Sequence, residues 1–195
     1  VATSSPDQTR ERILDAAEAE FSRLGVEGAG MKGIATAAGV SQGLLHYHFG
    51  TKDGLYGAVI ERRSALINAA RHAMLDAIDV DALAPREAVE AIFGAMFAPP
   101  LGPSGGGQVY ARIFASLAVG PERDQDLVSR HYDATALCFI DALCRAEPRA
   151  SRQAAAWAYS FALGALIGTV NRDGRPGRLM GRAPDRRQTP TDELV

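Results

Sequence analysis

The sequence predicts an all-α protein. Three observations support this: alanine is abundant while valine and threonine are sparse, apolar residues recur at helical spacing, and no segment alternates apolar and polar residues for long. Proline and glycine interrupt the pattern at intervals typical of helix ends. With 195 residues, 47% of them hydrophobic, the chain is long enough to bury a core in one or two domains.

Start signals, stop signals and apolar periodicity together predict eight helices. Ser5-Pro6-Asp7-Gln8 has the order of a helix start, with Thr9 as a rival cap, and Gly25 is placed to stop this first helix. Thr51 is placed to cap a long fourth helix, and Pro148 to end the seventh. The expected ranges are about 6–25, 31–37, 42–48, 52–79, 85–99, 108–119, 123–146 and 150–172.

Composition excludes several classes of function. A net charge of −2 gives no overall attraction to nucleic acid, so any such attraction has to be local. Cys138 and Cys144 lack a metal-ligand spacing, and we interpret them as two small thiols in a reducing environment. No apolar run is long enough for a transmembrane helix and no signal peptide is visible, so we expect a cytoplasmic protein that binds no metal.

Residues 31–48 carry the pattern of two short helices joined by a tight turn, the helix-turn-helix unit. Ala35 supplies a small residue where the two helices cross. Gly39, four residues later, suits the left-handed backbone that the turn requires. Ile34, Val40 and Leu45 supply apolar contacts that fix the angle between the helices.

The second of these short helices is the candidate for insertion into a DNA major groove, because its outward side chains are short or can form hydrogen bonds. Gln42 can pair with adenine, and Leu44 can contact a thymine methyl group. His46, Tyr47 and His48 can reach bases or phosphates. Taken singly, Gln42 and His46 can also be ordinary solvated side chains, and Tyr47 can be a core aromatic. For His48 alone, an ordinary structural role is the better explanation.

The two lysines, Lys32 and Lys52, lie in the first turns of predicted helices. A cation there is unfavourable by about 0.3–1 kcal/mol, because the N-terminal end of a helix is positive. An incoming phosphate, held by exposed N–H groups and the ammonium, would explain the placement. Because no carboxylate occurs between residues 28 and 52, we predict that this face meets a polyanion.

The block from Thr9 to about Val59 resembles the DNA-binding domain of the TetR family of bacterial transcriptional regulators, with TRERILDAAEAEFSRLGVEG followed by IATAAGVSQGLLHYHFGTKDGLY. The resemblance implies a homodimer, usually a repressor that a small molecule releases from its double-stranded DNA operator. We expect a three-helix DNA-binding domain over 1–50, a helical ligand-binding and dimerisation domain over 51–172, and a Gly/Pro/Arg-rich tail over 173–195, whose last residues have the order of a helix start. The expected DNA contacts are Thr9, Lys32, Ser41, Gln42, Gly43, Leu44, His46, Tyr47, His48 and Lys52.

Three positions depart from the family pattern. His46 stands where tyrosine is commonest, Gly30 where a threonine cap often contacts phosphate, and Gly50 where lysine is frequent. Each departure removes or weakens a backbone contact, so we expect a modest affinity or a redistribution of contacts.

Beyond residue 59 the resemblance is one of outline. Large apolar residues at helical spacing are usually core, but the resemblance implies that a subset lines a cavity for an unidentified small-molecule effector. Tyr110, Arg112 and His131 are potential polar anchors, although a surface or capping position suits His131 better. The expected lining residues are Phe93, Met96, Phe97, Tyr110, Phe114, Phe139, Trp157 and Phe161.

Gly164 and Gly168, with Ala165 nearby, lie on one face of the expected eighth helix. Glycine inside a helix costs about 1 kcal/mol relative to alanine, and a close contact between helices would explain it. We expect the seventh and eighth helices to form a four-helix interface across a two-fold axis. Alternatively, the glycines face another helix of the same subunit.

Two other classes of function remain open. An enzyme is not expected, because there is no metal motif, no glycine-rich phosphate loop after a strand, and no nucleophile with an obvious base. A helix-turn-helix scaffold that binds a protein partner predicts an uncharged or acidic outer face on the helix at 42–47. Its binding would also survive raised salt, whereas phosphate contacts weaken steeply.

Overall fold

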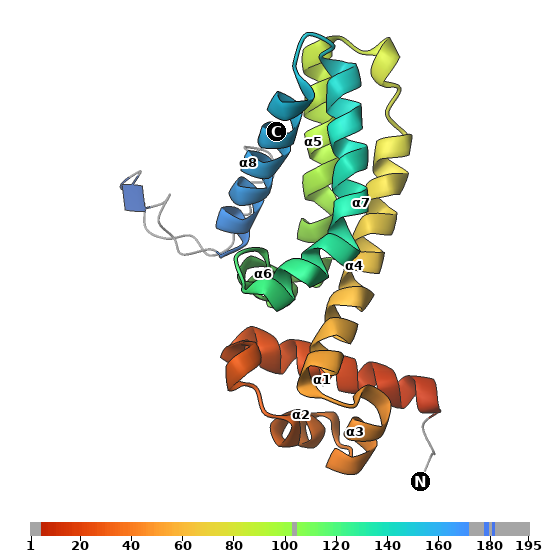
Figure 1. Cartoon of the computed structure of the whole chain (residues 1–195), viewed down its shortest axis with the longest axis vertical. Coiled ribbons are helices and arrows are strands. Elements are labelled where there is room, and N and C mark those ends of the chain that lie inside the picture. The colour runs from red at the N-terminus through yellow and green to blue at the C-terminus, as the bar shows by residue number, and fades with distance from the viewer. Residues whose placement is uncertain (1–4, 103–104, 172–177, 180, 182–195) are drawn as a thin grey trace.

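The computed structural model describes residues 5–102, 105–171, 178–179 and 181. This part of the chain is helical and contains no strand, as predicted. In Figure 1 the helices between residues 6 and 49 form a lower unit, from which the long helix Lys52–Asp76 rises into an upper bundle. The helices are α1 Pro6–Gly28, α2 Met31–Ala38, α3 Gln42–Phe49, α4 Lys52–Asp76, η1 Val80–Ala82, α5 Pro85–Leu101, α6 Gly107–Ala118, α7 Glu122–Ala146 and α8 Arg152–Asn171.

Most helix ends lie within a few residues of the predicted ones, and two differ for identifiable reasons. The predicted capping box is present at α1, where Gln8 N–H donates to Ser5 Oγ over 3.2 Å. Gly25 does not stop α1: it takes φ 71° and kinks the helix, which resumes for one more turn. α5 runs through Pro99 and Pro100, because its last turn is closed by Gly102 N–H donating to the Ala98 carbonyl at 2.9 Å.

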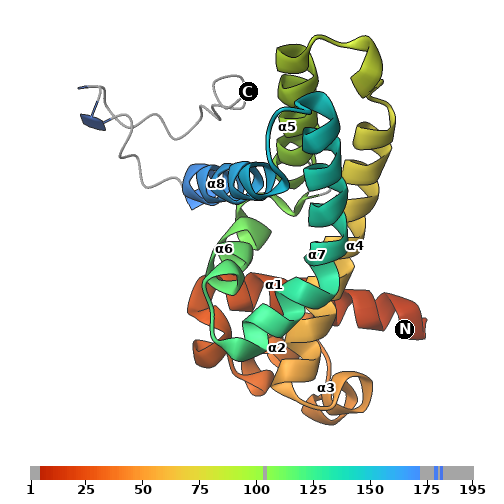
Figure 2. The same cartoon turned by 45° about the horizontal axis from the view of Figure 1, so that its top comes forward.

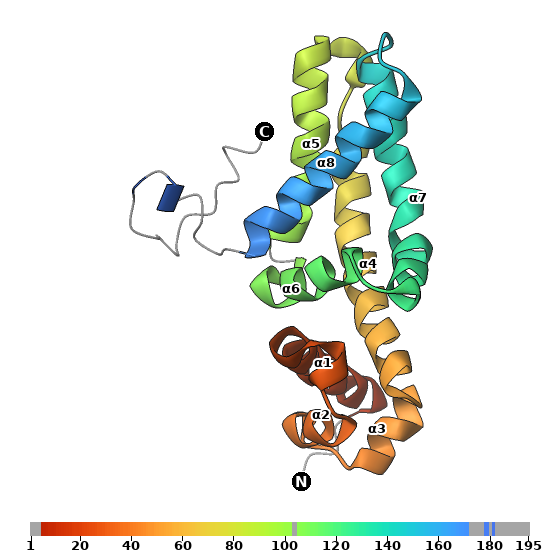
Figure 3. The same cartoon turned by 60° about the vertical axis from the view of Figure 1, so that its left-hand side comes forward.

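The lower core joins α1 to α4 and then continues upward. Its α1 side chains meet apolar residues of α2, α3 and the first three turns of α4. The same cluster includes residues of α6 and α7, and Figure 3 shows α6 lying directly above α1. The expected boundary after residue 50 is therefore not a break in the core. The buried members are Ile13, Leu14, Ala17, Phe21, Ala29, Ile34, Ala35, Ala38, Leu45, Leu55, Tyr56, Val59, Ile60, Ile67, Tyr110, Ile113, Leu117, Leu127 and Tyr132.

A second core fills the upper bundle, where α5 and α7 pack beside the upper half of α4 and α8 lies across them (Figures 2 and 3). Phe139 of α7 is buried among Met96 and Phe97 of α5 and Tyr159 of α8. α4 thus contributes to both cores and connects them.

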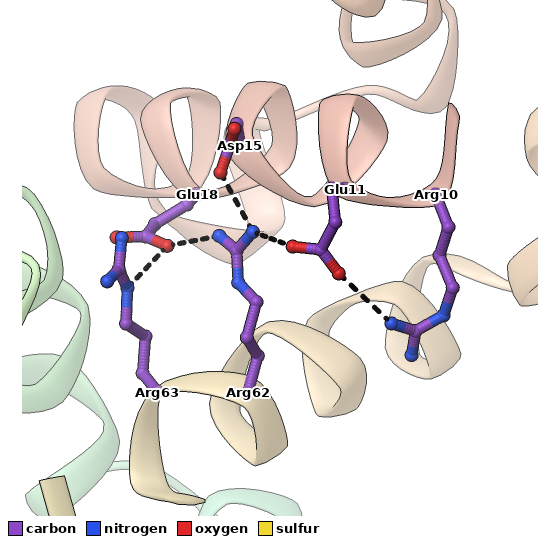
Figure 4. Close-up of polar contacts among 6 residues, drawn as sticks. All are labelled: Arg10, Glu11, Asp15, Glu18, Arg62 and Arg63. Atoms are coloured by element: carbon purple, nitrogen blue, oxygen red, sulfur yellow. Dashed lines mark hydrogen bonds and ion pairs between the residues drawn. The ribbon is translucent and has the colours of Figure 1, made fainter. Parts of the chain in front are cut away.

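An ion-pair cluster holds α1 against α4 (Figure 4). Glu18, only 3% exposed, accepts hydrogen bonds from Arg62 Nη2 at 2.7 Å and from Arg63 Nε at 2.8 Å. Arg62 also donates to Glu11 and Asp15, at 3.0 and 2.8 Å. A buried carboxylate is tolerated only when it is paired and hydrogen-bonded, so these contacts fix how α4 leaves the lower unit.

Candidate nucleic-acid interface and effector pocket

The turn between α2 and α3 has the predicted helix-turn-helix construction. Gly39 adopts the left-handed conformation with φ 65°, and Val40 N–H donates to the Ala35 carbonyl at 3.0 Å. The Arg12 guanidinium of α1 donates to the Ala38 carbonyl at 2.8 Å, so it satisfies a carbonyl that the end of α2 leaves unpaired. α1 therefore holds the turn from behind while α3 remains on the outside.

α3 presents most of its length to solvent. Ser41 caps it by accepting from Leu44 N–H at 3.1 Å, and the next residues, Gln42 and Gly43, are exposed. Leu44 is 37% exposed and Tyr47 83%, whereas Leu45 on the opposite side is fully buried. An aromatic residue so exposed at the end of a short helix gains little from the fold itself, which makes it available for a partner.

The histidine side chains of α3 are less free than expected for residues that contact DNA. The Nδ1 of His46 lies 2.6 Å from the Gly50 carbonyl, and Nε2 lies 3.5 Å from the Gln42 side-chain nitrogen. The carbonyl can only accept, so Nδ1 carries the proton and Nε2 accepts from Gln42. His46 thus holds Gln42 in place. His48 and Thr9 are half-buried.

The two lysines have different surroundings. Lys32 is exposed and makes no ion pair with any described residue. The ammonium of Lys52 donates to the Glu27 carbonyl at 3.2 Å and lies 3.7 Å from the Glu27 carboxylate. The fold thus brings a carboxylate beside Lys52 from outside residues 28–52, and contact of this face with a polyanion stays a prediction. Sequence reasoning missed the end of α1, which the fold brings beside the start of α4. Glu27 there gives Lys52 a partner without any phosphate.

Arg123, at the start of α7, contacts the same junction between the end of α1 and the start of α4. Its guanidinium donates to Glu27 at 3.3 Å and to Asp53 at 3.0 Å, and it lies 5.5 Å from the centre of the Tyr56 ring. The upper bundle thereby contacts the junction of α1 and α4 directly. Exposed ion pairs of this kind contribute at most about 1 kcal/mol each, so they can be exchanged for other anions.

The position of α3 relative to α4 depends on Gly54 in the first turn of α4. A Cβ at this residue would lie 2.4 Å from the Phe49 carbonyl oxygen, a distance at which backbone has to move. Thr51 caps the same turn by accepting from Gly54 N–H at 3.0 Å. The missing side chain lets the two helices approach, and it sets the angle at which α3 faces outward.

A pocket lies between the two cores, where α4, α6, α7 and α8 meet. It holds about 370 Å³ of space, a volume that includes the open mouth and the solvent in it. The lining is predominantly apolar. It consists of Ile67, Arg71, Pro100, Gly105, Tyr110, Ala111, Phe114, Tyr132, Leu166 and Ile167.

Of the eight expected lining residues, the structure places Tyr110 and Phe114 at the pocket. Phe93, Met96, Phe97 and Phe139 belong to the upper core instead. The placement of Trp157 and Phe161 in the pocket is wrong: they are 57% and 70% exposed and stack on each other on the outside of α8, with ring centres 5.6 Å apart. Of the potential anchors, Arg112 is exposed, and neither it nor His131 lines the pocket.

Arg71 is the principal residue of the pocket that sequence reasoning missed. It is 3% exposed, and its Nε donates to the Met96 carbonyl at 3.0 Å. Burial lowers the pKa of this guanidinium, and only tyrosines oppose the effect. A signal was present in the sequence, because Arg71 continues the apolar stripe of α4 at Ile67 and Leu75, four residues away on either side.

Two tyrosines complete the polar side of the pocket. The hydroxyl oxygens of Tyr110 and Tyr132 lie 2.5 Å apart and share a hydrogen bond. Burial raises the pKa of Tyr132 to about 12 and that of Tyr110 well above its usual value. Both phenols therefore keep their protons at neutral pH.

The outer face of α8 carries the glycines expected at a subunit interface. Gly164, Ala165 and Gly168 are exposed, in line with Trp157 and Phe161. A Cβ added at Gly164 or Gly168 would meet no described atom within 4 Å, so no described helix of the same subunit requires the glycines. The alternative that they face such a helix is wrong for this part of the chain.

Two other kinds of site are absent from the described residues. No group of three or more His, Cys, Asp or Glu side chains is arranged to hold a metal ion there. Within the same part of the chain, no helix is both long and apolar enough to cross a membrane.

Three family models match the sequence, and the one described as "DNA mismatch repair protein MutS C-terminal region" covers only residues 70–93. The model described as "Bacterial regulatory proteins, tetR family" matches residues 13–59, which span most of α1 and all of α2 and α3. The model described as "Tetracyclin repressor-like, C-terminal domain" matches residues 90–195, more than half of the chain.

Curated relatives are similar over part of the chain. An HTH-type transcriptional repressor, SCO4008 of Streptomyces coelicolor, is 36% identical over 63 residues, or 32% of this chain and 33% of that protein. An HTH-type transcriptional activator, FasR of Mycolicibacterium smegmatis, is 40% identical over 88 residues, or 45% of this chain and 40% of that protein. The matches thus cover less than half the length of these relatives.

Solved structures share the fold over almost the whole chain. A transcriptional regulator from Pseudomonas aeruginosa superposes with a TM-score of 0.70 at 17% identity, covering 99% of this chain and 88% of that one. A regulator from Saccharomonospora viridis in complex with choline gives 0.62 at 20% identity, covering 96% and 92%. FadR of Bacillus subtilis in complex with stearoyl-CoA gives 0.68 at 14% identity, covering 94% and 92%. This similarity shows the fold, and the two TetR-family models, one of which matches more than half of the chain, show that the chain belongs to the TetR family of bacterial regulatory proteins.

Proposed function

We propose that the chain is a sequence-specific DNA-binding transcriptional regulator, a repressor that a small ligand releases from its operator. The observation that carries the proposal is the outward face of α3, where hydrogen-bonding and aromatic side chains stand exposed on a helix-turn-helix unit. Gln42, held by His46, is the candidate for reading adenine, and Leu44 the candidate for a thymine methyl. Such a regulator works in the cytoplasm, where the DNA is.

Phosphate contacts are assigned to the starts of α2 and α4. Lys32 and the exposed N–H groups of the first turn of α2 can receive one phosphate. At α4, a phosphate has to replace Glu27 as the partner of Lys52. The carboxylate of Glu27 is 82% exposed and 3.7 Å from the ammonium, so its replacement costs about 1 kcal/mol or less.

The protein acts as a homodimer in this proposal. The exposed stripe of α8, with Trp157, Phe161 and the two glycines, supplies a face on which the same helix of a second subunit can pack closely. Leu137 of α7 is a further exposed apolar side chain on the other helix of the proposed interface. Two copies of α3 would then sit about 34–36 Å apart, the spacing of successive major grooves on one side of the duplex.

α4 carries the ligand signal to the DNA. Its lower end holds Lys52, and its upper half supplies Ile67 and Arg71 to the pocket. Residues 52 and 71 are roughly 28 Å apart along the helix, so a tilt of about 5° at the pocket moves the lower end by roughly 2.5 Å. A ligand that binds the tilted state more tightly shifts the protein toward that state. The DNA affinity can then fall by as much as the ratio of the ligand's affinities for the two states.

The test begins with selection of bound duplexes from random DNA. Replacement of Gln42 with alanine should change the selected sequence, whereas Lys52→Ala should weaken binding to all sequences about equally. Glu27→Gln should tighten binding, because it removes the anion that competes with phosphate for Lys52.

The proposal fails if no duplex is enriched or if Gln42→Ala leaves the selected sequence unchanged. Binding of a protein partner that persists undiminished at high salt would support the alternative function, a scaffold for protein contacts.

A further inference from the structure

The polar side of the pocket offers positive charge without an anion to balance it. Arg71 is 3% exposed, and among the described residues its guanidinium has a single hydrogen bond, from Nε to the Met96 carbonyl. No carboxylate of the described chain pairs with it, and the side chains that affect its pKa are all tyrosines. Burial of an unpaired charge is costly, and such arginines normally have an acidic partner.

The tyrosine pair adds a donor at the same place. Of the two hydroxyl protons on Tyr110 and Tyr132, one lies in the hydrogen bond between them. The other has no acceptor among the described residues. A guanidinium has donors and no acceptor, so the polar side of the pocket has a surplus of donors and a positive charge.

The remaining lining is apolar. Ile67, Phe114, Leu166 and Ile167 contribute hydrocarbon or aromatic surface, and Pro100 closes one side. A ligand that fills this space has an apolar body and a single anionic end. A cation would lie against Arg71, and a neutral amide would leave the guanidinium charge unbalanced.

We propose that the effector is a small carboxylate with an apolar body, whose carboxylate accepts hydrogen bonds from Arg71 and from the free hydroxyl of the Tyr110–Tyr132 pair. This inference rests on the proposed function, because it names the chemical class of the releasing ligand. The carboxylate supplies the partner that Arg71 lacks, and the apolar body displaces water from the rest of the lining.

Isothermal titration calorimetry on the full chain at about pH 7.5, where simple carboxylates are ionised, tests the ligand class directly. Benzoate and hexanoate are the anionic probes, benzamide and hexanamide are their neutral matches, and choline is the cationic one. Each carboxylate should bind about tenfold to a hundredfold more tightly than its amide, because the charge-assisted hydrogen bonds to the arginine are lost. Choline should not bind.

Variants of the pocket residues test whether Arg71 binds the carboxylate. Arg71→Gln should weaken benzoate binding at least about tenfold, and Arg71→Lys, which keeps the charge, should weaken it less. Tyr110→Phe should weaken it by a smaller factor. Arg112→Gln, an exposed arginine on the same helix as Tyr110, is the matched control and should bind benzoate as the wild type does.

The proposal is overturned if the amides or choline bind as well as the carboxylates, or if neither carboxylate binds to the folded wild type more tightly than about 10 mM. It is also overturned if a folded Arg71→Gln variant keeps the affinity. The comparison of probes on the wild type decides the matter even where that variant does not fold. Failure of DNA selection would overturn the proposed function and leave the calorimetry intact, whereas DNA binding without carboxylate binding would overturn only this inference.

Discussion

Replacement of Glu18 with glutamine tests whether the ion-pair cluster of Figure 4 fixes α4 on α1. The substitution keeps the shape of the side chain and removes its charge. Glu18 accepts from Arg62 at 2.7 Å and from Arg63 at 2.8 and 2.9 Å, and it is almost fully buried. After the change, Arg63 has no carboxylate partner among the described residues, whereas Arg62 keeps two.

The expected loss of stability follows from burial. Removal of one member of a fully buried pair costs about 3–5 kcal/mol. The arginine side chains are 16% and 20% exposed, so water recovers part of this, and we expect about 2–3 kcal/mol. For a chain of this length each kcal/mol lowers the Tm by about 2–4 °C, which gives a decrease of about 4–12 °C.

Differential scanning calorimetry measures this, with Glu11→Gln as the matched control. Glu11 pairs with the same Arg62 at 3.0 Å, but its side chain is 54% exposed, so its loss should cost about 1 kcal/mol or less. Equal decreases in Tm for the two variants would refute the assignment of the stability to the buried contact. A decrease below about 2 °C for Glu18→Gln would do the same.

Three further changes probe other parts of the structure. Gly54→Ala should weaken DNA binding at least about tenfold, because the added Cβ would push the Phe49 carbonyl and turn α3. Circular dichroism should show little loss of helix content, and an unchanged DNA affinity would contradict this prediction. Phe161→Ser should shift the dimer toward monomer in sedimentation, whereas Val119→Ser, exposed elsewhere, should not; monomeric wild type would refute the interface. Burial raises the pKa of Tyr132 to about 12, so on raising the pH this phenol loses its proton in the unfolded state first. The free energy of unfolding should therefore fall as pH rises from about 10 to 12. An equally steep fall in the Tyr132→Phe variant would exclude a contribution from Tyr132.

Local signals in the sequence predicted the parts of the fold that are satisfied locally. The Ser5–Gln8 capping box and the Gly39 turn depend on residues within a few positions of each other, and both are present. The exposed face of α3 was predicted for the same reason, because Leu45 fixes which side is buried.

Contacts between distant segments could not be predicted in this way. The partner of Lys52 is Glu27, which lies 25 residues earlier and comes close only after α1 has packed on α4. Helical periodicity showed that Trp157 and Phe161 share a stripe but not whether it faces inward, and the structure puts it outside. Arg71 was missed because an unpaired buried arginine is rare, although its helical register with Ile67 places it on the buried face.

The salt dependence of DNA binding by Lys32→Ala tests most directly whether the helix starts of the lower unit hold phosphates. Lys32 has no ion pair with any described residue, so its loss should cost the fold little, and Arg86→Ala in α5 is an exposed cationic control in the upper bundle. On a selected duplex, Lys32→Ala should lower the slope of log K against log salt by about 0.9, the value for one phosphate contact, and Arg86→Ala should leave it unchanged. An unchanged slope and affinity for Lys32→Ala would contradict the account.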